Sequence, residues 1–259
     1  ETVYTAGLHR RLKGLRPAFS SFQERRSKHF ILRVQPGADE VLLDYCLPVL
    51  ERALETNSKE LGVQVDEPII VEFFTDVESL HLATTLPKAD IERTSAVAVC
   101  KFNRIIMTTP RMYLQGYAWA DTLSHEMAHY LIAKKTGQRV PVWLHEGIAK
   151  WQETRWRGLY RPRGLDPMSA SLLNRAVRDT KLIPFSKMHP SIAMLDSQEE
   201  AALAYAQCVT FVEHFTRCAE ADQPLAVLLD RIAAGRSIEE AFEDVTGTAF
   251  GDLRKRWRK

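Results

Sequence analysis

Three features that would narrow the function of this chain are absent from its 259 residues. The sequence has no apolar run long enough to span a bilayer, so it predicts no membrane span. It also has no excess of charge of one sign, because 35 basic residues stand against 33 acidic ones and leave a net charge of +2. That near balance predicts neither a nucleic-acid partner nor an electrostatic attraction to membranes. We therefore expect a globular protein whose partners are not selected by overall charge.

Cysteine is scarce as well. The four cysteines are too scattered for a disulfide framework, and none has the C-x-x-C spacing of a metal or redox motif. We therefore interpret all four as buried apolar filler: Cys46, Cys100, Cys208 and Cys218.

The sequence lacks an initiator methionine, and no apolar signal segment follows its first residue, Glu1. We interpret the chain as a processed form or an excised domain. A neighbouring domain outside this chain and an exported protein both agree with that interpretation, while the compartment itself is not indicated. Residues 1–28 are rich in arginine and lysine and show little periodicity, which predicts a basic lead-in or linker. Docking to a preceding domain is the alternative.

One stretch of the chain carries a metal-binding pattern. Apolar residues recur at helical spacing over residues 117–135, which predicts a helix that ends at Gly137. His125 and His129 are four residues apart, so their imidazoles share one face of that helix. Two imidazoles so placed can hold one zinc ion, and Glu126 can reach a water molecule at the metal. The segment H-E-M-A-H therefore predicts a zinc hydrolase, in which Glu126 takes a proton from the water and passes it to a leaving amine.

A catalytic zinc ion usually has three protein ligands and one open position, so a third ligand is expected elsewhere in the chain. Sixteen residues separate His129 from Glu146. A turn signal at residues 136–138 and the proline at 141 predict a second helix over residues 141–153, packed antiparallel to the first. Glu146 in its first turns can face the two histidines. Its neighbours are apolar, and a carboxylate among apolar side chains needs a partner.

The segments H-E-M-A-H and W-L-H-E-G-I-A-K-W resemble the gluzincin clan of metallopeptidases. They are most similar to the peptidase-MA-like group, whose relatives include the catalytic domains of thermolysin and aminopeptidase N. The resemblance implies zinc ligands at His125, His129 and Glu146, with Glu126 as the general base in the hydrolysis of a peptide bond. His145 is interpreted as a residue that supports a metal ligand or lies at the rim of the site, pointing elsewhere on the helix, and not as a ligand itself.

The chain departs from related patterns in three ways. The glycine and third histidine of metzincins do not follow His129, since Ile132 and Lys135 stand there instead. The G-x-M-E-N segment by which aminopeptidases recognise a free amine is absent, which argues against an aminopeptidase and leaves an endopeptidase or another specificity. Lys150 stands where thermolysin-like relatives place a carboxylate that orients a histidine ligand. If no other group fills that role, zinc affinity falls by about 10–100-fold.

Peptide hydrolysis builds negative charge on the attacked oxygen, and a nearby donor stabilises it. In aminopeptidase-like gluzincins a tyrosine from a later helix is this donor. Tyr205 lies on a helix predicted over residues 197–220, in a segment, A-Y-A-Q-C-V-T-F-V, that resembles the corresponding family segment. Two alternatives remain open: Tyr205 as a core residue on the apolar stripe of that helix, and His214 as the donor. At most one of Tyr205 and His214 is expected to face the zinc.

We predict an α+β fold of the zincin-like, gluzincin type, in which a small mixed α/β lobe with a β-sheet precedes a mainly helical lobe. A helix over residues 39–61 contains Pro48, which is expected to kink or split it. The strands are predicted over residues 29–34, 68–74, 94–101 and 104–109, and the last two form a hairpin around Phe102 and Asn103. We assign the metallopeptidase domain to residues 29–220, and a C-terminal helical cap of that domain to residues 221–259.

The expected partner is a peptide or protein substrate. Its backbone is expected to pair with a strand over residues 95–100, although an ordinary hairpin is the alternative for that segment. The arginine-rich residues 154–164 can hold an acidic side chain or a terminal carboxylate of the substrate, or form a solvated loop. A different function class is a catalytically idle zinc-binding domain that serves as a protein-binding module, and a third is a zinc hydrolase of a non-peptide amide or ester. The presence of Glu126 favours an enzyme, because a structural metal site needs no base.

Overall fold

The computed structural model describes residues 21–89, 91, 97–160, 162 and 164–258. These residues form two compact units. Unit 1 comprises the described residues of Glu1–Ala53 and Val65–Glu126, and unit 2 comprises those of Leu54–Gln64 and Met127–Lys259. Two helices, α2 (Leu42–Leu61) and α5 (Trp119–Thr136), contribute residues to both units.

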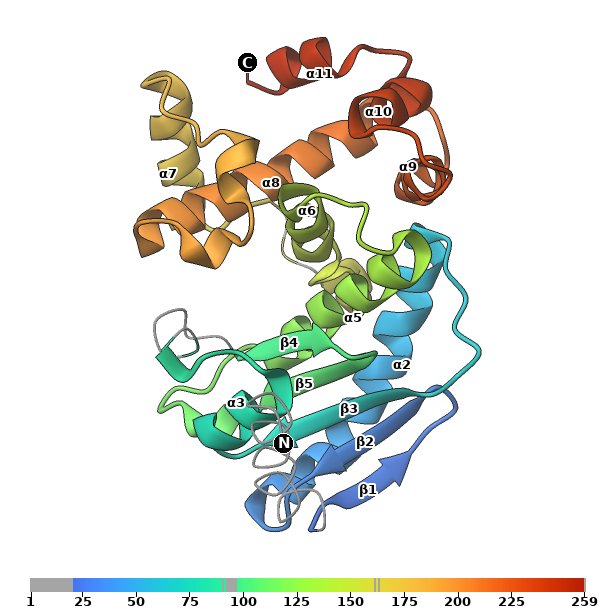
Figure 1. Cartoon of the computed structure of the whole chain (residues 1–259), viewed down its shortest axis with the longest axis vertical. Coiled ribbons are helices and arrows are strands. Elements are labelled where there is room, and N and C mark those ends of the chain that lie inside the picture. Colours follow the sequence, from blue (N-terminus) through green and yellow to red (C-terminus); the bar gives the residue numbers. More distant parts are fainter. Residues whose placement is uncertain (1–20, 90, 92–96, 161, 163, 259) are drawn as a thin grey trace, which may run out of the picture. The chain divides into compact units, whose positions relative to one another are not determined.

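Unit 1 is built on a five-stranded sheet with the strand order β1-β2-β3-β5-β4 (Figure 1). The central pairs β2–β3 and β3–β5 are parallel, whereas the edge strands β1 and β4 are antiparallel to their neighbours. The strands are β1 (Gln23–Arg26), β2 (Phe30–Val34), β3 (Ile69–Phe74), β4 (Ala98–Lys101) and β5 (Arg104–Thr108). The predicted hairpin is confirmed: β4 and β5 are joined at Phe102 and Asn103, whose φ angles of 54° and 56° suit a two-residue turn. Residues 94–96, where we expected the first strand of this hairpin to begin, lie outside the described residues.

Strand β1 corrects the lead-in predicted over residues 1–28. It pairs with β2 from Gln23 opposite Val34 to Arg26 opposite Ile31. All four residues of β1 are exposed, so the strand has no apolar alternation from which it could be predicted. Residues 1–20 lie outside the described residues.

Buried side chains cover both faces of the sheet, because successive residues of a strand point to opposite faces. On one face, Phe30, Leu32, Val71 and Phe73 are fully buried. On the other, helix α3 (Val77–Thr84) packs against β3 and β5; the hydrophobic cluster there consists of Phe74, Leu80, Ala83, Ile91 and Ile106. Asp76 caps the N-terminus of α3, where its carboxylate accepts a hydrogen bond from the backbone N–H of Ser79 at 2.7 Å.

Helix α2 is a single helix of 20 residues with Pro48 inside it, so the predicted split does not occur. Proline removes one hydrogen bond from the helix backbone. The buried side of the helix runs past this point on both sides, and Cys46, Leu50 and Ala53 are fully buried. Packing along this face holds the two halves in one helix. A 3-10 turn, η1 (Ala38–Val41), precedes α2.

Unit 2 is helical, and the structure thus confirms the predicted α+β class. Its last three helices lie in the region 221–259, which is predicted to be helical. Ser237 and Glu240 form a capping box at the start of one of these helices. The elements of unit 2 after α5 are α6 (Val142–Gln152), η3 (Arg155–Tyr160), α7 (Pro167–Arg178), η4 (Phe185–Met188), η5 (Ile192–Met194), α8 (Gln198–Cys218), α9 (Pro224–Ala233), α10 (Ile238–Thr246) and α11 (Phe250–Trp257). The division at residue 220 into a domain and its cap stays a prediction.

The ammonium group of Lys135 joins three segments of unit 2. Its Nζ donates to the carbonyl oxygens of Leu61 at 2.9 Å, Gly62 at 3.2 Å and Ala226 at 3.1 Å, and pairs with Asp230 at 2.9 Å. The last carbonyls of a helix have no partner within the helix. Lys135 therefore caps α2 and fastens the last turn of α5 to α9.

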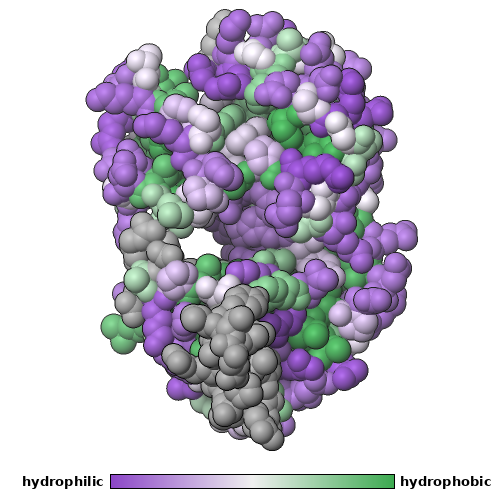
Figure 2. Space-filling model, viewed as in Figure 1, coloured by the Kyte–Doolittle hydropathy of each residue, from purple (hydrophilic) through white to green (hydrophobic). Residues whose placement is uncertain are grey.

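The polarity of the surface, the helices and the cysteines give little further indication of function. On the face shown in Figure 2, hydrophilic side chains predominate and hydrophobic ones are interspersed among them. Among the described residues, no helix combines the length and the apolar character needed to cross a membrane. All four cysteines are free thiols, but only Cys46 and Cys208 are buried. Cys100 and Cys218 are half-buried, which corrects their interpretation as buried filler.

Candidate metal centre

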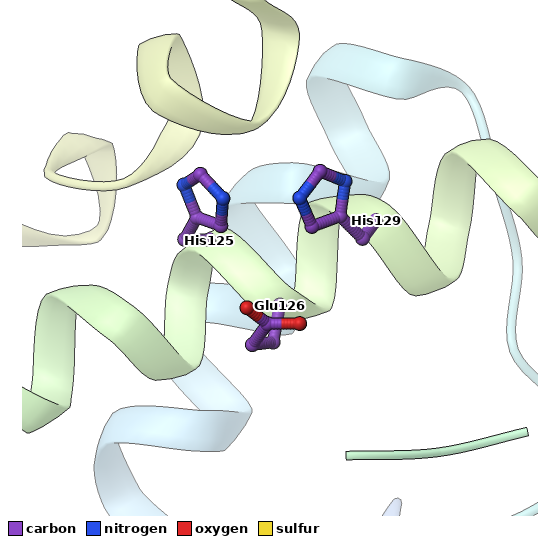
Figure 3. A group of neighbouring side chains, drawn as sticks. All are labelled: His125, Glu126 and His129. Carbon is purple, nitrogen blue, oxygen red and sulfur yellow. The ribbon is translucent and has the colours of Figure 1, made fainter. Parts of the chain in front are cut away.

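Helix α5 presents three side chains that could hold a metal ion. The donor atoms of His125, Glu126 and His129 lie within 4.8 Å of one another. In Figure 3 the two imidazoles stand side by side on one side of the helix, with the Glu126 carboxylate below them. Glu126 is 6% exposed and the histidines are half-buried. The i, i+4 spacing thus places the two imidazoles as the sequence predicts.

Helix α6 brings Glu146 to His129. Gly137, with φ of 65°, ends α5 by donating to the carbonyl of Ala133 at 2.8 Å, and α6 begins after Pro141. The Glu146 carboxylate then lies 3.5 Å from Nε2 of His129. His129 and Glu146 are 14% and 22% exposed, so both are largely shielded from water.

His145 contacts the other nitrogen of His129. The two Nδ1 atoms are 2.5 Å apart, and the rings are stacked with their centroids 4.6 Å apart and an angle of 18° between their planes. This contact agrees with the first of the two roles predicted for His145, support of a ligand, although its ring lies against His129 and does not point elsewhere on the helix. A histidine that binds a metal through one nitrogen usually contacts a polar group through the other. His145 occupies that position at His129, whose Nε2 faces Glu146.

Helix α6 is fixed in place by close packing against α8 and by aromatic contacts. A Cβ atom on Gly147 would lie 2.8 Å from the backbone oxygen of Cys208 and 3.0 Å from Cγ2 of Val212. Only glycine allows so close an approach of the two helices. The indole of Trp143 stacks on the ring of Phe185, with centroids 4.1 Å apart and an angle of 5° between the planes. Glu146 therefore projects from a helix with little freedom to move against α8.

These residues fit a divalent metal ion, because two imidazoles and a carboxylate are a common set of zinc ligands. A family model of the peptidase MA superfamily matches residues 50–259. The chain belongs to the peptidase MA superfamily. This confirms the resemblance to gluzincin-type metallopeptidases that the two motifs indicate. A search of curated proteins finds no match.

Tyr205 and His214 both lie on α8, but their surroundings differ. Tyr205 precedes Cys208 by three residues. The Cys208 thiol lies near enough to Glu146 for the charge of that carboxylate to affect its pKa. Burial raises the pKa of the Cys208 thiol, and the Glu146 carboxylate raises it further. His214 instead contacts Sγ of Cys218 at 3.6 Å and the backbone of Leu253 on α11. Burial lowers the pKa of His214.

Two residues near Glu126 were not found from the sequence. Burial raises the pKa of the Cys100 thiol on β4 to about 12, and the Glu126 carboxylate adds to the shift. Burial also raises the pKa of Tyr117, with a smaller contribution from Glu126. The hydroxyl of Tyr117 donates to the backbone oxygen of Thr108 at 2.5 Å. Neither residue has a local sequence signal, since Cys100 is placed by strand pairing and Tyr117 by the hydrogen bond of its hydroxyl to Thr108.

The basic side chains predicted around the centre are engaged elsewhere. Lys150 pairs with Glu153, the residue that follows α6, at 2.7 and 2.8 Å. Arg155 donates through Nε to Glu60 at 2.5 Å and lies over the ring of Trp151. The guanidinium of Arg157 lies 5.3 Å from the centre of the Trp156 ring. Arg161 and Arg163, the other two arginines of this stretch, lie outside the described residues.

Proposed function

We propose that this member of the peptidase MA superfamily is a zinc-dependent metallopeptidase that hydrolyses peptide bonds. The observation that carries the proposal is the grouping of His125, Glu126 and His129 on α5, with the Glu146 carboxylate 3.5 Å from His129. In this proposal His125, His129 and Glu146 hold the zinc ion. Glu126 is not a metal ligand in this proposal and acts as the general base. When bound, zinc lowers the pKa of a water molecule to about 7 and polarises a carbonyl.

The role of Glu126 follows from its place beside the two histidines. Its carboxylate is buried, with 6% of the residue exposed. A carboxylate so shielded from bulk water can take a proton from a water molecule next to the histidines. It then gives that proton to the amine that leaves the cleaved peptide bond. This exchange needs no further titratable group.

Tyr205 is the proposed donor to the attacked carbonyl oxygen. Its support is its position on α8, one turn before Cys208, whose thiol feels the charge of Glu146. His214 is disfavoured because it is engaged with Cys218 and Leu253.

The substrate backbone is proposed to pair with β4. This strand is at the edge of the described sheet, so one side of its backbone is open to another strand. Cys100 lies on β4, and the charge of Glu126 contributes to the raised pKa of its thiol. A peptide added along β4 would therefore run close to the proposed base. The absence of a G-x-M-E-N segment argues for a substrate that is recognised along its chain and not by a free amine.

The decisive experiment joins metal analysis with cleavage of an unfolded protein such as casein. Protein purified without a chelator is expected to hold about one zinc ion, and Glu146→Ala is expected to lose it. Glu126→Gln is expected to keep the metal and to lose activity by about 10²–10⁴-fold. Glu243→Gln, at an exposed position of α10, is the matched control and should leave both unchanged. Full activity of Glu126→Gln would contradict the mechanism, and a chain that takes up no zinc would be better explained as a binding domain.

A further inference from the structure

A groove of about 610 Å³ lies between α6, α8 and the segment that follows η3, all within unit 2. Trp151, Val209 and Leu165 give it apolar walls. Of its charged lining residues, three are basic (Lys150, Arg155, Arg217) and one is acidic (Glu213). None of these side chains is used by the proposed mechanism.

The groove continues the helix faces that carry two proposed site residues. Lys150 is four residues after Glu146 on α6, and Val209 is four residues after Tyr205 on α8, so each pair shares one face of its helix. The rise of an α-helix places the start of the groove about 6 Å from Glu146 and Tyr205 along the helix axes. Arg217, three turns after Tyr205, lies at about 18 Å. The distance of about 18 Å from Tyr205 to Arg217 accommodates about five residues of an extended peptide.

The basic side chains differ in how tightly they are held. Arg155 is 21% exposed and is fixed by Glu60 and by the ring of Trp151, with the guanidinium 4.8 Å from the ring centre. Lys150 is 43% exposed and, among the described residues, pairs only with Glu153, which directly follows its helix. Arg217 is 75% exposed and donates to Glu213 at 2.6 Å. Exposed pairs three or four residues apart stabilise a helix only weakly, so Lys150 and Arg217 can exchange their partners for a ligand carboxylate.

We propose that this groove binds the substrate chain on one side of the scissile bond and selects peptides with acidic side chains. Lys150 and Arg217 take the substrate carboxylates, with Arg217 able to bind bidentately. Trp151 and Val209 pack against the apolar parts of the same residues. The proposal rests on the proposed function, because it takes the groove as an extension of the peptidase site. It moves the predicted recognition of acidic substrates from the arginines of residues 154–164 to Lys150 and Arg217.

The test measures peptide binding separately from cleavage. Three fluorescein-labelled peptides of equal length, which differ only in carrying two Glu, two Gln or two Lys residues, are titrated with Glu126→Gln protein and followed by anisotropy. The Glu peptide is expected to bind about tenfold tighter than the Gln peptide, and the Lys peptide more weakly than either. The preference is expected to decrease as the salt concentration rises.

Charge-reversing substitutions in the groove test whether its basic side chains cause the preference for the Glu peptide. Lys150→Glu and Arg217→Glu are each expected to reduce the preference for the Glu peptide, and the double variant to favour the Lys peptide. Lys255→Glu is the matched control, because Lys255 is 75% exposed and pairs with Asp252 three residues away on α11. The neutral variants Lys150→Gln and Arg217→Gln test the same point if charge reversal disturbs folding.

The outcomes separate this inference from the proposed function. Equal binding of the three peptides, no binding of any of them, or a preference that the groove variants leave unchanged would overturn the inference. A zinc peptidase that cleaves all three peptides equally would also overturn it while leaving the function intact. A preference for the Glu peptide that depends on Lys150 and Arg217, in a protein without peptidase activity, would support the groove and contradict the function.

Discussion

The backbone oxygen of Cys208 lies where a side chain at Gly147 would have to be, since a Cβ atom there would be 2.8 Å away. Backbone atoms of packed helices cannot yield as the end of a flexible side chain can. The close approach therefore fixes the position of α6 against α8 at the residue next to Glu146.

Replacing Gly147 with alanine is expected to push α6 away from α8. Overpacking of this kind typically costs about 1–3 kcal/mol, and each kcal/mol lowers the melting temperature by about 2–4 °C in proteins of this size. Thermal unfolding followed by circular dichroism measures the effect, and zinc affinity should fall with it. The control is Gly251→Ala on α11, where a Cβ atom meets nothing within 4 Å. A Gly147→Ala protein as stable as the control would contradict the packing argument.

Replacing His145 with alanine removes the group that contacts Nδ1 of His129. Losing such a partner typically lowers metal affinity by about 10–100-fold. Competition with a chromogenic chelator measures the zinc affinity directly. His214→Ala is the control, because His214 contacts Cys218 and Leu253. Equal losses in both variants would mean that the contact with His129 is not what matters.

Replacing Tyr205 with phenylalanine removes a hydroxyl and little volume. If Tyr205 is the donor to the attacked oxygen, kcat is expected to fall by about 10²–10³-fold. Zinc content and KM should stay close to their original values, because neither the ligands nor the groove is altered. Steady-state kinetics on a peptide substrate separates the two constants. An unchanged kcat would mean that Tyr205 is a half-buried residue of α8 without a catalytic role.

Replacing Lys135 with methionine keeps most of the side-chain volume and removes the ammonium group. Three backbone carbonyls lose a charged donor in a position where the lysine side chain is 9% exposed. A hydrogen bond to a charged group contributes about 1.5–3 kcal/mol, so the free energy of unfolding should fall by at least about 1.5–3 kcal/mol. Urea unfolding measures it. Lys134→Met, at the exposed neighbouring position, is expected to have little effect.

The sequence predicts well those features that depend on neighbours along one helix. The spacing of His125 and His129 and the helix that carries Glu146 each follow from local geometry. The site could therefore be outlined before the fold was known.

Other features depend on contacts between distant segments and have no local signal. The polar strand Gln23–Arg26 exists because β2 offers it an edge, not because its own residues favour a strand. The contact of His145 with His129 depends on how α6 is placed against α5. Pro48 remains within one helix because the side chains around it are buried together. Cys100 comes near Glu126 only after the sheet has formed.

The contacts of Lys135 also bear on how the chain folds while it is being synthesised. The carbonyls that this ammonium binds come from residues 61–62 and from residue 226. A nascent chain that has not yet reached α9 lacks one side of this junction, and chains fold from the N-terminus as they emerge. The end of α2 is therefore secured late. A ribosome-bound chain that stops before residue 224 should leave this helix end open to proteases, and one that includes α9 should protect it.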